Sequence, residues 1–356
     1  MREDGAALLP RGVGLSLTVL SVAYPLAPVG PDAAGGAEQV LAHLDAALVR
    51  AGHRSLVVAC AGSRVEGELL EVPRIEGVLD DKTRARAQES HRQAIAAALT
   101  THRVDLVHLH GIDFDAYLPP PGVPALATLH LPPSWYAEGA LRPGRPLTWL
   151  NCVSAAQHRT CPPGPALLEP IGNGVPVEAL AARHAKRGYA LCIGRICPEK
   201  GYHLALDAAR RAGRPLLLAG RVYPYAEHEA YWAARIEPRL DRLRRFVGPA
   251  GFARKRRLLS GARCLVVPSL VPETSSLVAM EALACGTPVV AFPAGALAEI
   301  VEHGRTGFLV EDEAAMAEAI EASGGIDPET CRAAARERFS AGAMTRRYLD
   351  LYGRLA

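Results

Sequence analysis

The chain has 356 residues, of which 49% are apolar and 22% are charged, as in an ordinary globular protein. Its 40 lysines and arginines and 37 aspartates and glutamates give a formal net charge of +3. This charge is too small to indicate a nucleic acid or an anionic membrane as partner. The length exceeds what one hydrophobic core usually supports, and two domains of roughly 150–200 residues are expected.

No run of 18 or more apolar residues is present, so the sequence predicts no transmembrane segment. Residues 1–14 mix acidic and basic side chains and lack the order of a signal peptide. The eight cysteines form no CxxC pair and mostly lie within apolar runs, which predicts buried free thiols in a reducing compartment and no zinc site. We therefore expect a cytoplasmic protein, either a monomer or a homodimer.

Short β-branched runs alternate with alanine-rich helical patterns along the first half of the chain. The expected elements there are a strand at 14–23, a helix at 36–51, a strand at 55–60, a helix at 83–100, and strands at 106–109, 125–129, 150–153 and 167–170. From residue 189 the pattern restarts. It predicts strands at 189–193, 215–219, 245–247, 263–267 and 288–291, with helices at 201–212, 227–240, 252–260 and 276–285 between them.

Strand–helix–strand units in two series predict an α/β fold of two Rossmann-like, doubly wound parallel sheets that face each other across a cleft. The turn-rich segment 171–176 separates the two series. We expect a first domain at 1–171 and a second at 172–340. The last helix, about 341–356, carries apolar and aromatic residues at helical spacing and is expected to pack back on the first domain.

Ligands of parallel sheets bind at the carboxyl ends of the strands, so the space between the two domains is the expected site. Gly35 and Gly36 open the first helix after a long loop, and adjacent glycines let backbone amides approach a phosphate closely. A purely structural turn is an equally good explanation, because the full GxGxxG fingerprint is absent.

Two cations follow the first strand of the second domain. Arg195 comes directly after Gly194 at the carboxyl end of that strand, and Lys200 precedes the next helix. A guanidinium can bind a diphosphate bidentately, and an ammonium binds it as a point charge. The alternative is a pair of solvated surface charges.

Histidines cluster at the ends of two predicted strands. His108 and His110 flank the end of one predicted strand, and one of them is expected in the core. His130 ends another strand of the same sheet and is predicted at the cleft. No metal site is expected at these histidines. The basic run 254–257 is expected on the solvated side of a helix and not as a nucleic-acid site.

Glu281 interrupts a helix that is otherwise apolar. Ser275 or Ser276 can serve as the N-cap of this helix. An unpaired buried carboxylate is costly, so Glu281 needs a hydrogen-bonding partner, either another side chain or a ligand. A second carboxylate, Glu273, and the serines at the helix start, which could hold an anion, favour a ligand.

Together these segments resemble glycosyltransferase family 4, retaining nucleotide-sugar transferases of the GT-B fold. The resemblance extends from Gly35 and Gly36 to residues 304–310. Its most specific part is the pair of glutamates, Glu273 and Glu281, followed by residues 282–290. The segments 194–201 and 172–175 also match the family in order and spacing.

The resemblance implies that Glu281 binds the ribose hydroxyls and that Glu273 binds the hydroxyls of the transferred sugar. Arg195 and Lys200 would hold the diphosphate, and Gly36 would add a backbone amide from the first domain. A diphosphate at the helix start leaves the ribose roughly 8 Å along the helix, which is where Glu281 lies.

Other donor contacts are implied in the same way. Backbone amides of Ser276, Leu277 and Val278 would complete the anion site, and His130 would face the donor sugar near the reaction centre. The remaining donor-binding residues carried over from the family are Gly35, Gly194, Asn173 and Ser275. Many family members have Gly-Phe-Gly or Pro-Phe-Gly where this chain has residues 274–276, a difference that bears on which sugar is bound.

Two carboxylates also suit a retaining glycosidase, but a glutamate at ribose distance cannot attack the anomeric carbon. The family instead implies front-face substitution, in which the leaving diphosphate accepts the acceptor proton and protein cations stabilise its charge. No metal or other cofactor is expected. Two alternatives are a sugar-nucleotide epimerase or hydrolase and a non-catalytic nucleotide-sugar binding protein. The base is taken as uridine. The acceptor, a carbohydrate, a lipid-linked sugar or a natural product, is expected to contact segments 24–34 and 132–145.

Overall fold

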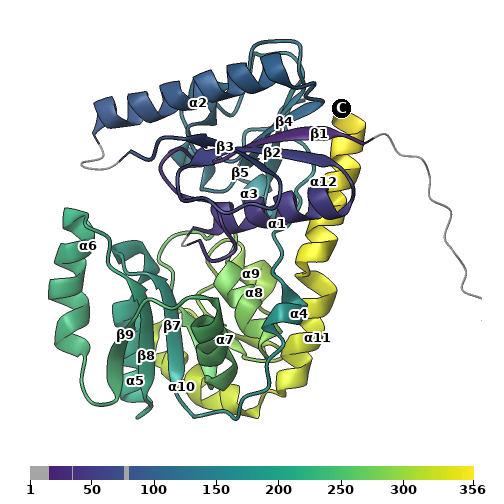
Figure 1. The fold of residues 1–356 in the computed structure, drawn as a ribbon. Coiled ribbons are helices and arrows are strands. Elements are labelled where there is room, and N and C mark those ends of the chain that lie inside the picture. Colours follow the sequence, from purple (N-terminus) through teal and green to yellow (C-terminus); the bar gives the residue numbers. More distant parts are fainter. Residues whose placement is uncertain (1–15, 34, 76–79) are drawn as a thin grey trace, which may run out of the picture.

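The computed structural model describes residues 16–33, 35–75 and 80–356, which form two parallel sheets of six strands each (Figure 1). The strand order is β3-β2-β1-β4-β5-β6 in the first sheet and β12-β11-β10-β7-β8-β9 in the second. Counted within each sheet, both follow the order 3-2-1-4-5-6 of a dinucleotide-binding fold. The predicted α/β architecture of two doubly wound sheets is confirmed.

The strands of the first sheet are short and mostly buried. They are β1 (Thr18–Val22), β2 (Arg54–Cys60), β3 (Glu68–Val72), β4 (Leu106–Leu109), β5 (Ala125–Leu129) and β6 (Thr148–Cys152). The strands of the second sheet are β7 (Ala190–Arg195), β8 (Leu216–Arg221), β9 (Arg244–Gly248), β10 (Cys264–Val267), β11 (Val289–Ala291) and β12 (Gly307–Leu309).

Helices cover the faces of both sheets, as the crossover connections of parallel strands require. Those of the first half are α1 (Gly36–Arg50), α2 (Asp81–Thr101) and α3 (Ala155–His158), whereas α4 (Val177–Leu180) packs in the core of the second half. Those of the second half are α5 (Tyr202–Arg211), α6 (Ala226–Tyr231), α7 (Phe252–Gly261), α8 (Leu277–Ala284), α9 (Leu297–Ile300), α10 (Glu313–Ala322), α11 (Pro328–Arg338) and α12 (Ala341–Leu355). Among the described residues, no helix is both long enough and apolar enough to span a bilayer.

Some predicted elements differ from the structure. The strand expected at 167–170 is only a single bridge between Leu150 and Leu167. The helix expected at 227–240 stops at Tyr231 and continues as a π turn and a 3-10 turn that contains Pro238, which has no backbone N–H to donate. The edge strands β3 and β12 were not predicted, because their charged or very short sequences lack a clear alternation.

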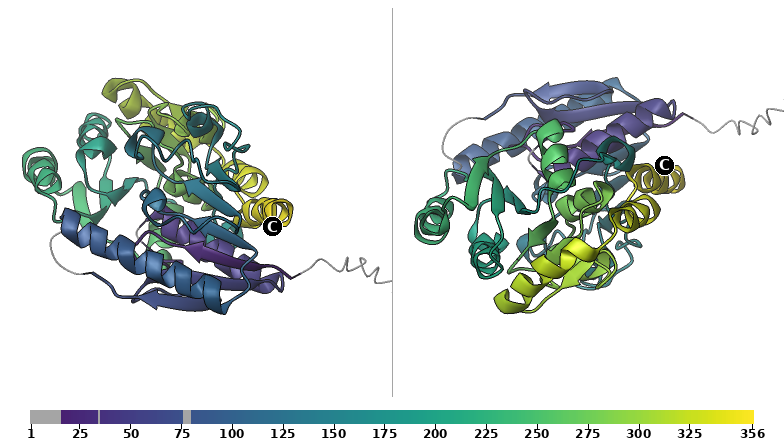
Figure 2. Two further views of the ribbon diagram at one scale, coloured as in Figure 1. Left: turned by 90° about the horizontal axis from the view of Figure 1, so that it is seen from above. Right: turned by 90° about the horizontal axis from the view of Figure 1, so that it is seen from below.

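The last helix, α12, packs against the first sheet although its sequence follows the second (Figure 1). Its buried face contains Met344, Tyr348 and Leu351, which join residues of α1 in one apolar cluster. The segment before α12 runs beside the segment that leads from the first sheet to the second, because Val175 and Ser340 form a bridge. Figure 2 shows α12 on the side of the molecule opposite α6. The two segments that join the sheets therefore run side by side.

Candidate functional site

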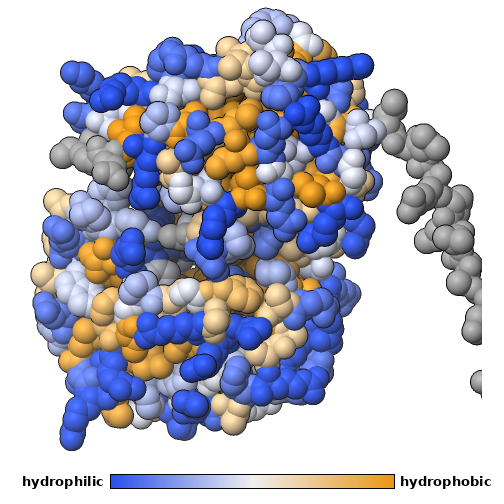
Figure 3. Space-filling view, in the orientation of Figure 1, coloured by the Kyte–Doolittle hydropathy of each residue, from blue (hydrophilic) through white to orange (hydrophobic). Residues whose placement is uncertain are grey.

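A small pocket of about 60 Å³ lies where the carboxyl ends of the two sheets meet. Its lining residues are Leu131, Pro132 and Trp135 from the first half, and Arg195, Glu199, Lys200 and residues 271–274 from the second. The space-filling view shows a hollow between the two halves (Figure 3). Pockets that bury a small ligand usually measure about 300 Å³ or more. The pocket in this structure is therefore smaller than the pockets that usually bury a small ligand.

Lys200 and Glu273 form the polar centre of this pocket. Lys200 Nζ lies 2.6 Å from Glu273 Oε1, and the two side chains are 23% and 10% exposed. Ser269 Oγ donates to the same carboxylate oxygen at 2.5 Å. Lys200 closes a 3-10 turn, Pro198–Lys200, after which Gly201 adopts a φ of 63°. A Cβ at Gly201 would lie 2.2 Å from the Pro268 carbonyl oxygen, so this turn needs glycine.

Arg195 is the last residue of β7, and its exposed side chain lines the same pocket. Gly194 precedes it with a φ of 152°, and a Cβ there would lie 2.7 Å from the buried hydroxyl of Tyr202. Glycine at 194 thus allows the close packing against Tyr202 directly before Arg195. The structure brings Arg195, Lys200 and Glu273 together, as their predicted shared role requires.

The start of α8 supplies backbone donors beside this group. Ser276 occupies the N-cap position of α8 but makes no side-chain capping bond. The Ser275 hydroxyl is buried, and it has no partner in the part of the chain that the structure describes. The first amides of a helix lack intrahelical acceptors, which leaves Leu277 and Val278 able to bind an anion.

The start of α1 faces the start of α8 across the two halves. A Cβ at Gly36 would lie 3.2 Å from Leu277 Cδ1, so these two helix starts are in contact. The Glu38 carboxylate folds back over Gly35, where a Cβ would lie 1.9 Å from Oε2. Burial raises the pKa of this carboxyl. The positive N-terminal ends of α1 and α8 therefore converge. An anion bound at the start of α1 would lie beside the Glu38 carboxyl group.

Glu281 is 4% exposed, and its carboxylate is paired with Lys255 of α7. Burial raises the pKa of Glu281, and the Lys255 ammonium opposes that shift. The partner that the sequence left open is thus a side chain in this structure, and a ribose contact stays a prediction. The expectation that residues 254–257 all lie on a solvated face is wrong for Lys255, whose side chain is 15% exposed because it turns toward Glu281.

His130 follows β5 and directly precedes the pocket residues Leu131 and Pro132. Its carbonyl oxygen accepts a hydrogen bond from Thr274 Oγ1 at 2.9 Å, which links the two halves. His130 Nε2 lies 3.0 Å from His110 Nδ1, so one ring must donate to the other. Burial lowers the pKa of His130 to about 4, and the imidazole is neutral at neutral pH. His108 and His110 are both buried, and His108 is bonded to Tyr352 and Thr128.

Asn173 lies in the segment that leads from the first half to the second. It is 6% exposed, and its backbone amide donates to the Val153 carbonyl at 3.2 Å. Its side-chain oxygen has no hydrogen-bond partner among the residues that the structure describes. Asn173 does not line the pocket described above, so its contact with a donor stays a prediction.

Sequence reasoning missed several residues of this site. Ser269, Thr274 and Lys255 make contacts with residues far away in the sequence, and no local pattern reveals such partners. Trp135 lies within the segment 132–145 that was expected to meet the acceptor. A lone tryptophan beside two prolines was the only signal available there.

A group with metal-ligating chemistry lies near the pocket. Cys197, Glu199 and His228 offer ligand atoms within 4.8 Å of one another. The pKa of the Cys197 thiol is raised to about 12, mainly by burial, so a metal would have to displace its proton. Cys197 and Glu199 belong to segment 194–201, whereas His228 was not singled out in the sequence, and the expectation that no metal takes part stays a prediction.

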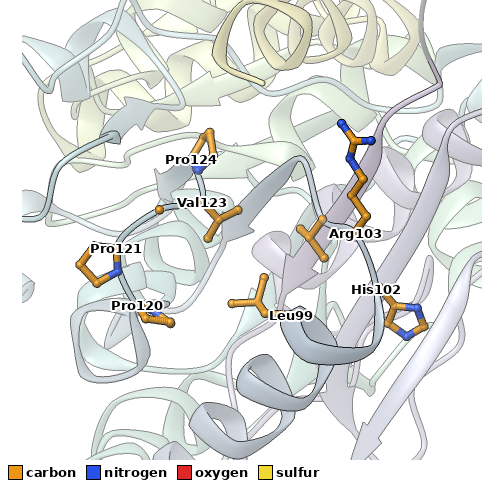
Figure 4. Close-up of a pocket in the computed structure, with 9 residues that line it drawn as sticks. Leu99, His102, Arg103, Pro120, Pro121, Val123 and Pro124 are labelled. Atoms are coloured by element: carbon orange, nitrogen blue, oxygen red, sulfur yellow. The ribbon is translucent and has the colours of Figure 1, made fainter.

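A larger cavity of about 380 Å³ lies elsewhere, between the end of α2 and the loop 120–124 (Figure 4). Figure 4 shows Pro120, Pro121 and Pro124 on one side of it and His102 and Arg103 on the other. These residues precede β4 and β5, so the cavity is at the amino ends of the strands. The carboxyl ends are where parallel sheets bind ligands, and the smaller pocket is therefore the candidate site.

Two family models match the chain and together cover most of it. The model described as Glycosyltransferase Family 4 matches residues 34–162, and the one described as Glycosyl transferases group 1 matches residues 187–323. The chain therefore belongs to glycosyltransferase family 4, group 1, and its two facing sheets are the GT-B fold.

Individual relatives agree with this class. The D-inositol 3-phosphate glycosyltransferase of Corynebacterium efficiens is 35% identical over 127 residues, which cover 33% of this chain and 30% of the relative. The glycogen synthase of Mycobacterium tuberculosis is 36% identical over 154 residues, 41% of this chain and 36% of the relative. The matched segments thus span about a third of the length of these curated relatives.

Solved structures match over nearly the whole chain. AviGT4, a glycosyltransferase involved in avilamycin A biosynthesis, is 27% identical with a TM-score of 0.72, and the match covers 95% of this chain and 98% of that one. The sucrose-phosphate synthase of Thermosynechococcus elongatus has a TM-score of 0.75 at 21% identity, covering 95% and 99% of the two chains. This second likeness concerns the fold alone.

Proposed function

We propose that the protein is a retaining glycosyltransferase that moves a sugar from a nucleoside diphosphate sugar to an acceptor hydroxyl. The observation that carries the proposal is the meeting of Lys200, Glu273 and Arg195 in one pocket at the carboxyl ends of both sheets. Membership of family 4 supports the same reaction class.

The diphosphate is assigned to Arg195, Lys200 and the amides at the start of α8. An Arg fork and an ammonium suit a group with two adjacent phosphates. The uncapped start of α8 and the contacting start of α1 add positive partial charge on two sides. Lys200 then exchanges its contact with Glu273 for one with the diphosphate, which frees Glu273 for the hydroxyls of the sugar.

The transfer proceeds on one face of the donor sugar. The bond from the anomeric carbon to the diphosphate oxygen breaks while the acceptor oxygen bonds to the same carbon from the same side, which retains configuration. The acceptor proton passes to the leaving phosphate oxygen. Arg195 and Lys200 stabilise the negative charge that grows on the diphosphate, so protein cations supply the counter-charge in this proposal. Neutral His130 directly precedes Leu131 of the opposite wall, and in this proposal it exchanges a hydrogen bond with a sugar hydroxyl.

Uridine is the proposed base, because it is the commonest in the family. The acceptor is proposed as a sugar or a sugar-bearing natural product, in line with the avilamycin pathway of the 27% identical AviGT4. Both assignments can be tested by a thermal-shift screen with UDP-, GDP-, ADP- and TDP-sugars. A donor at 100 times its dissociation constant stabilises the folded state by about 2.7 kcal/mol.

The decisive experiment measures transfer by wild type, Lys200→Ala and Glu273→Ala, with Lys82→Ala on exposed α2 as the matched control. We expect both site variants to stay folded and lose transfer, while Lys82→Ala keeps it. Full transfer activity in both site variants would contradict the proposal. Free nucleoside diphosphate is assayed with and without acceptor: release without transfer indicates a hydrolase, and binding without turnover indicates a binding protein.

A further inference from the structure

Trp135 is a large aromatic side chain that the fold leaves in the open. It is 49% exposed, whereas Trp149 and Trp232 are partly buried. It lines the same pocket as Arg195, Lys200 and Glu273. Its place beside the polar centre of the pocket, and not its exposure alone, makes this indole a candidate for ligand contact.

The backbone holds Trp135 firmly in this place. It ends a 3-10 turn, Pro133–Trp135, and its amide donates to the Pro132 carbonyl at 2.9 Å. Prolines 132 and 133 fix their own φ angles. The next residue, Tyr136, is buried, and its hydroxyl accepts a hydrogen bond from the Leu131 amide at 3.2 Å. A rigid exposed aromatic costs little conformational entropy when it binds a partner.

The two walls of the pocket differ in chemistry. The wall from the second half carries charged groups, which suit a diphosphate and sugar hydroxyls. The wall from the first half consists of Leu131, Pro132 and Trp135, which are apolar or aromatic. A molecule bound between the walls therefore meets charge on one side and an indole on the other.

We propose that Trp135 is the platform on which the acceptor stacks, and that the acceptor presents a ring with an apolar face next to its reacting hydroxyl. This inference rests on the proposed function, because the charged wall is assigned to the donor. The face of an indole is electron-rich and attracts the C–H groups of a ring stacked on it. A pyranose and an aromatic ring share that chemistry, whereas an open-chain alcohol lacks it.

The test compares acceptor kinetics of wild type, Trp135→Ala and Trp135→Phe. The control is Leu243→Ala, a substitution at an exposed apolar residue that directly precedes β9, at the amino end of the second sheet. The acceptor probes are methyl glycosides of common hexoses, simple phenols, and glycerol as the compound without a ring. The donor is the nucleotide sugar that gives the largest thermal shift.

We expect wild type to prefer a ring-bearing probe over glycerol, and the glycosides and phenols tell which ring it is. In Trp135→Ala the acceptor KM should rise about tenfold or more while the donor KM stays near the wild-type value. Trp135→Phe should recover most of the acceptor affinity, and Leu243→Ala should match wild type. An acceptor KM unchanged in Trp135→Ala, or glycerol used as well as any ring, would overturn the inference.

Quenching of tryptophan fluorescence gives a second measurement that does not need turnover. Glycosides or phenols that stack on Trp135 should quench the emission of wild type and not that of Trp135→Phe. Equal quenching in both proteins, or none in either, counts against the platform. A protein that binds no nucleotide and turns over no donor contradicts the proposed function instead, and the fluorescence result then still decides the role of Trp135.

Discussion

Lys200 Nζ lies 2.6 Å from Glu273 Oε1, so the ammonium that we propose for the donor diphosphate is paired with a carboxylate in this structure. Ser269 bonds to the same carboxylate oxygen from the loop after β10. In the proposed function, a diphosphate has to compete with Glu273 for this ammonium, so the ion pair opposes diphosphate binding.

Glu273→Gln should separate binding from transfer. Removing the negative charge frees Lys200 and relieves repulsion between Glu273 and the diphosphate, so UDP should bind equally well or more tightly. Transfer should fall about 100-fold or more, because the sugar hydroxyls lose a charged acceptor that strengthens in the transition state. Calorimetry with UDP measures the binding, and steady-state kinetics measure the transfer. Weaker UDP binding in Glu273→Gln would show that the carboxylate does not oppose the diphosphate.

Glu281→Gln tests the ribose contact. If Glu281 binds the ribose, this variant should weaken UDP binding about tenfold or more, because two hydroxyls lose a charged acceptor. Binding of inorganic pyrophosphate should not change, since it has no ribose. An equal loss of affinity for UDP and for pyrophosphate would mean that Glu281 acts on diphosphate binding or on the stability of the fold, and not on the ribose.

Glu281 also contributes to the stability of the fold, because its carboxylate is paired with Lys255. Breaking a buried ion pair from one side costs about 3–5 kcal/mol of unfolding free energy, whereas replacing both partners by apolar residues of similar size is often neutral. We therefore expect Lys255→Met to destabilise the protein more than the double variant Lys255→Met with Glu281→Leu. Urea denaturation measures the difference, and additive effects would mean that the two side chains do not interact.

Gly36→Ala tests the contact between the two helix starts. The new Cβ would lie 3.2 Å from a Leu277 methyl group, which can move by a few tenths of an ångström, so the fold should tolerate the change. The same methyl stands where a phosphate would approach the amide of residue 36, and donor affinity should fall about tenfold. Gly139→Ala is the matched control, because a Cβ there meets nothing within 4 Å. Unchanged donor affinity in Gly36→Ala would remove this helix from the donor site.

Tyr352→Phe tests how α12 is attached to the first sheet. The Tyr352 hydroxyl lies 2.7 Å from His108 Nδ1, and both groups are buried. Losing the hydroxyl leaves a buried ring nitrogen without a partner, at a cost of about 1–3 kcal/mol. Chemical denaturation should show this loss, while UDP affinity at low temperature stays at the wild-type level. A stability equal to wild type would mean that water replaces the hydroxyl.

Acid should destabilise the fold through its buried histidines. Burial lowers the pKa of His108 to about 3 and that of His91 and His130 to about 4, from 6.5. The unfolded chain then binds more protons than the folded one between about pH 6.5 and 4, so stability is present above pH 6.5 and is lost as the pH falls. At pH 5 each such histidine removes about 2 kcal/mol.

This prediction is checked by urea denaturation at pH 7 and pH 5. His108→Gln should be less stable than wild type at pH 7, but its loss of stability between the two pH values should be smaller by about 2 kcal/mol. The exposed His303→Gln serves as the control. An equal pH dependence in wild type and His108→Gln would show that this histidine takes up no extra proton on unfolding.

The alternation of apolar strands and amphipathic helices was enough to predict two parallel sheets, because strands buried on both faces appear as continuous β-branched runs. The motif around Glu273 and Glu281 was enough to indicate the family, since its charged residues occur at fixed spacing along one continuous segment. The short edge strands β3 and β12 escaped prediction because edge strands bury only part of their side chains and need no apolar run.

The partners of the charged side chains became visible only in the tertiary structure. Glu281 is paired with Lys255 of another helix, and Thr274 donates to the His130 carbonyl of the other half. Trp135 faces the charged wall because the two sheets approach each other there. Local sequence fixes which residues can carry charge or apolar surface, through propensity and periodicity. Which of them meet depends on how the two sheets pack, and that packing is a sum over contacts between distant segments that no local pattern contains.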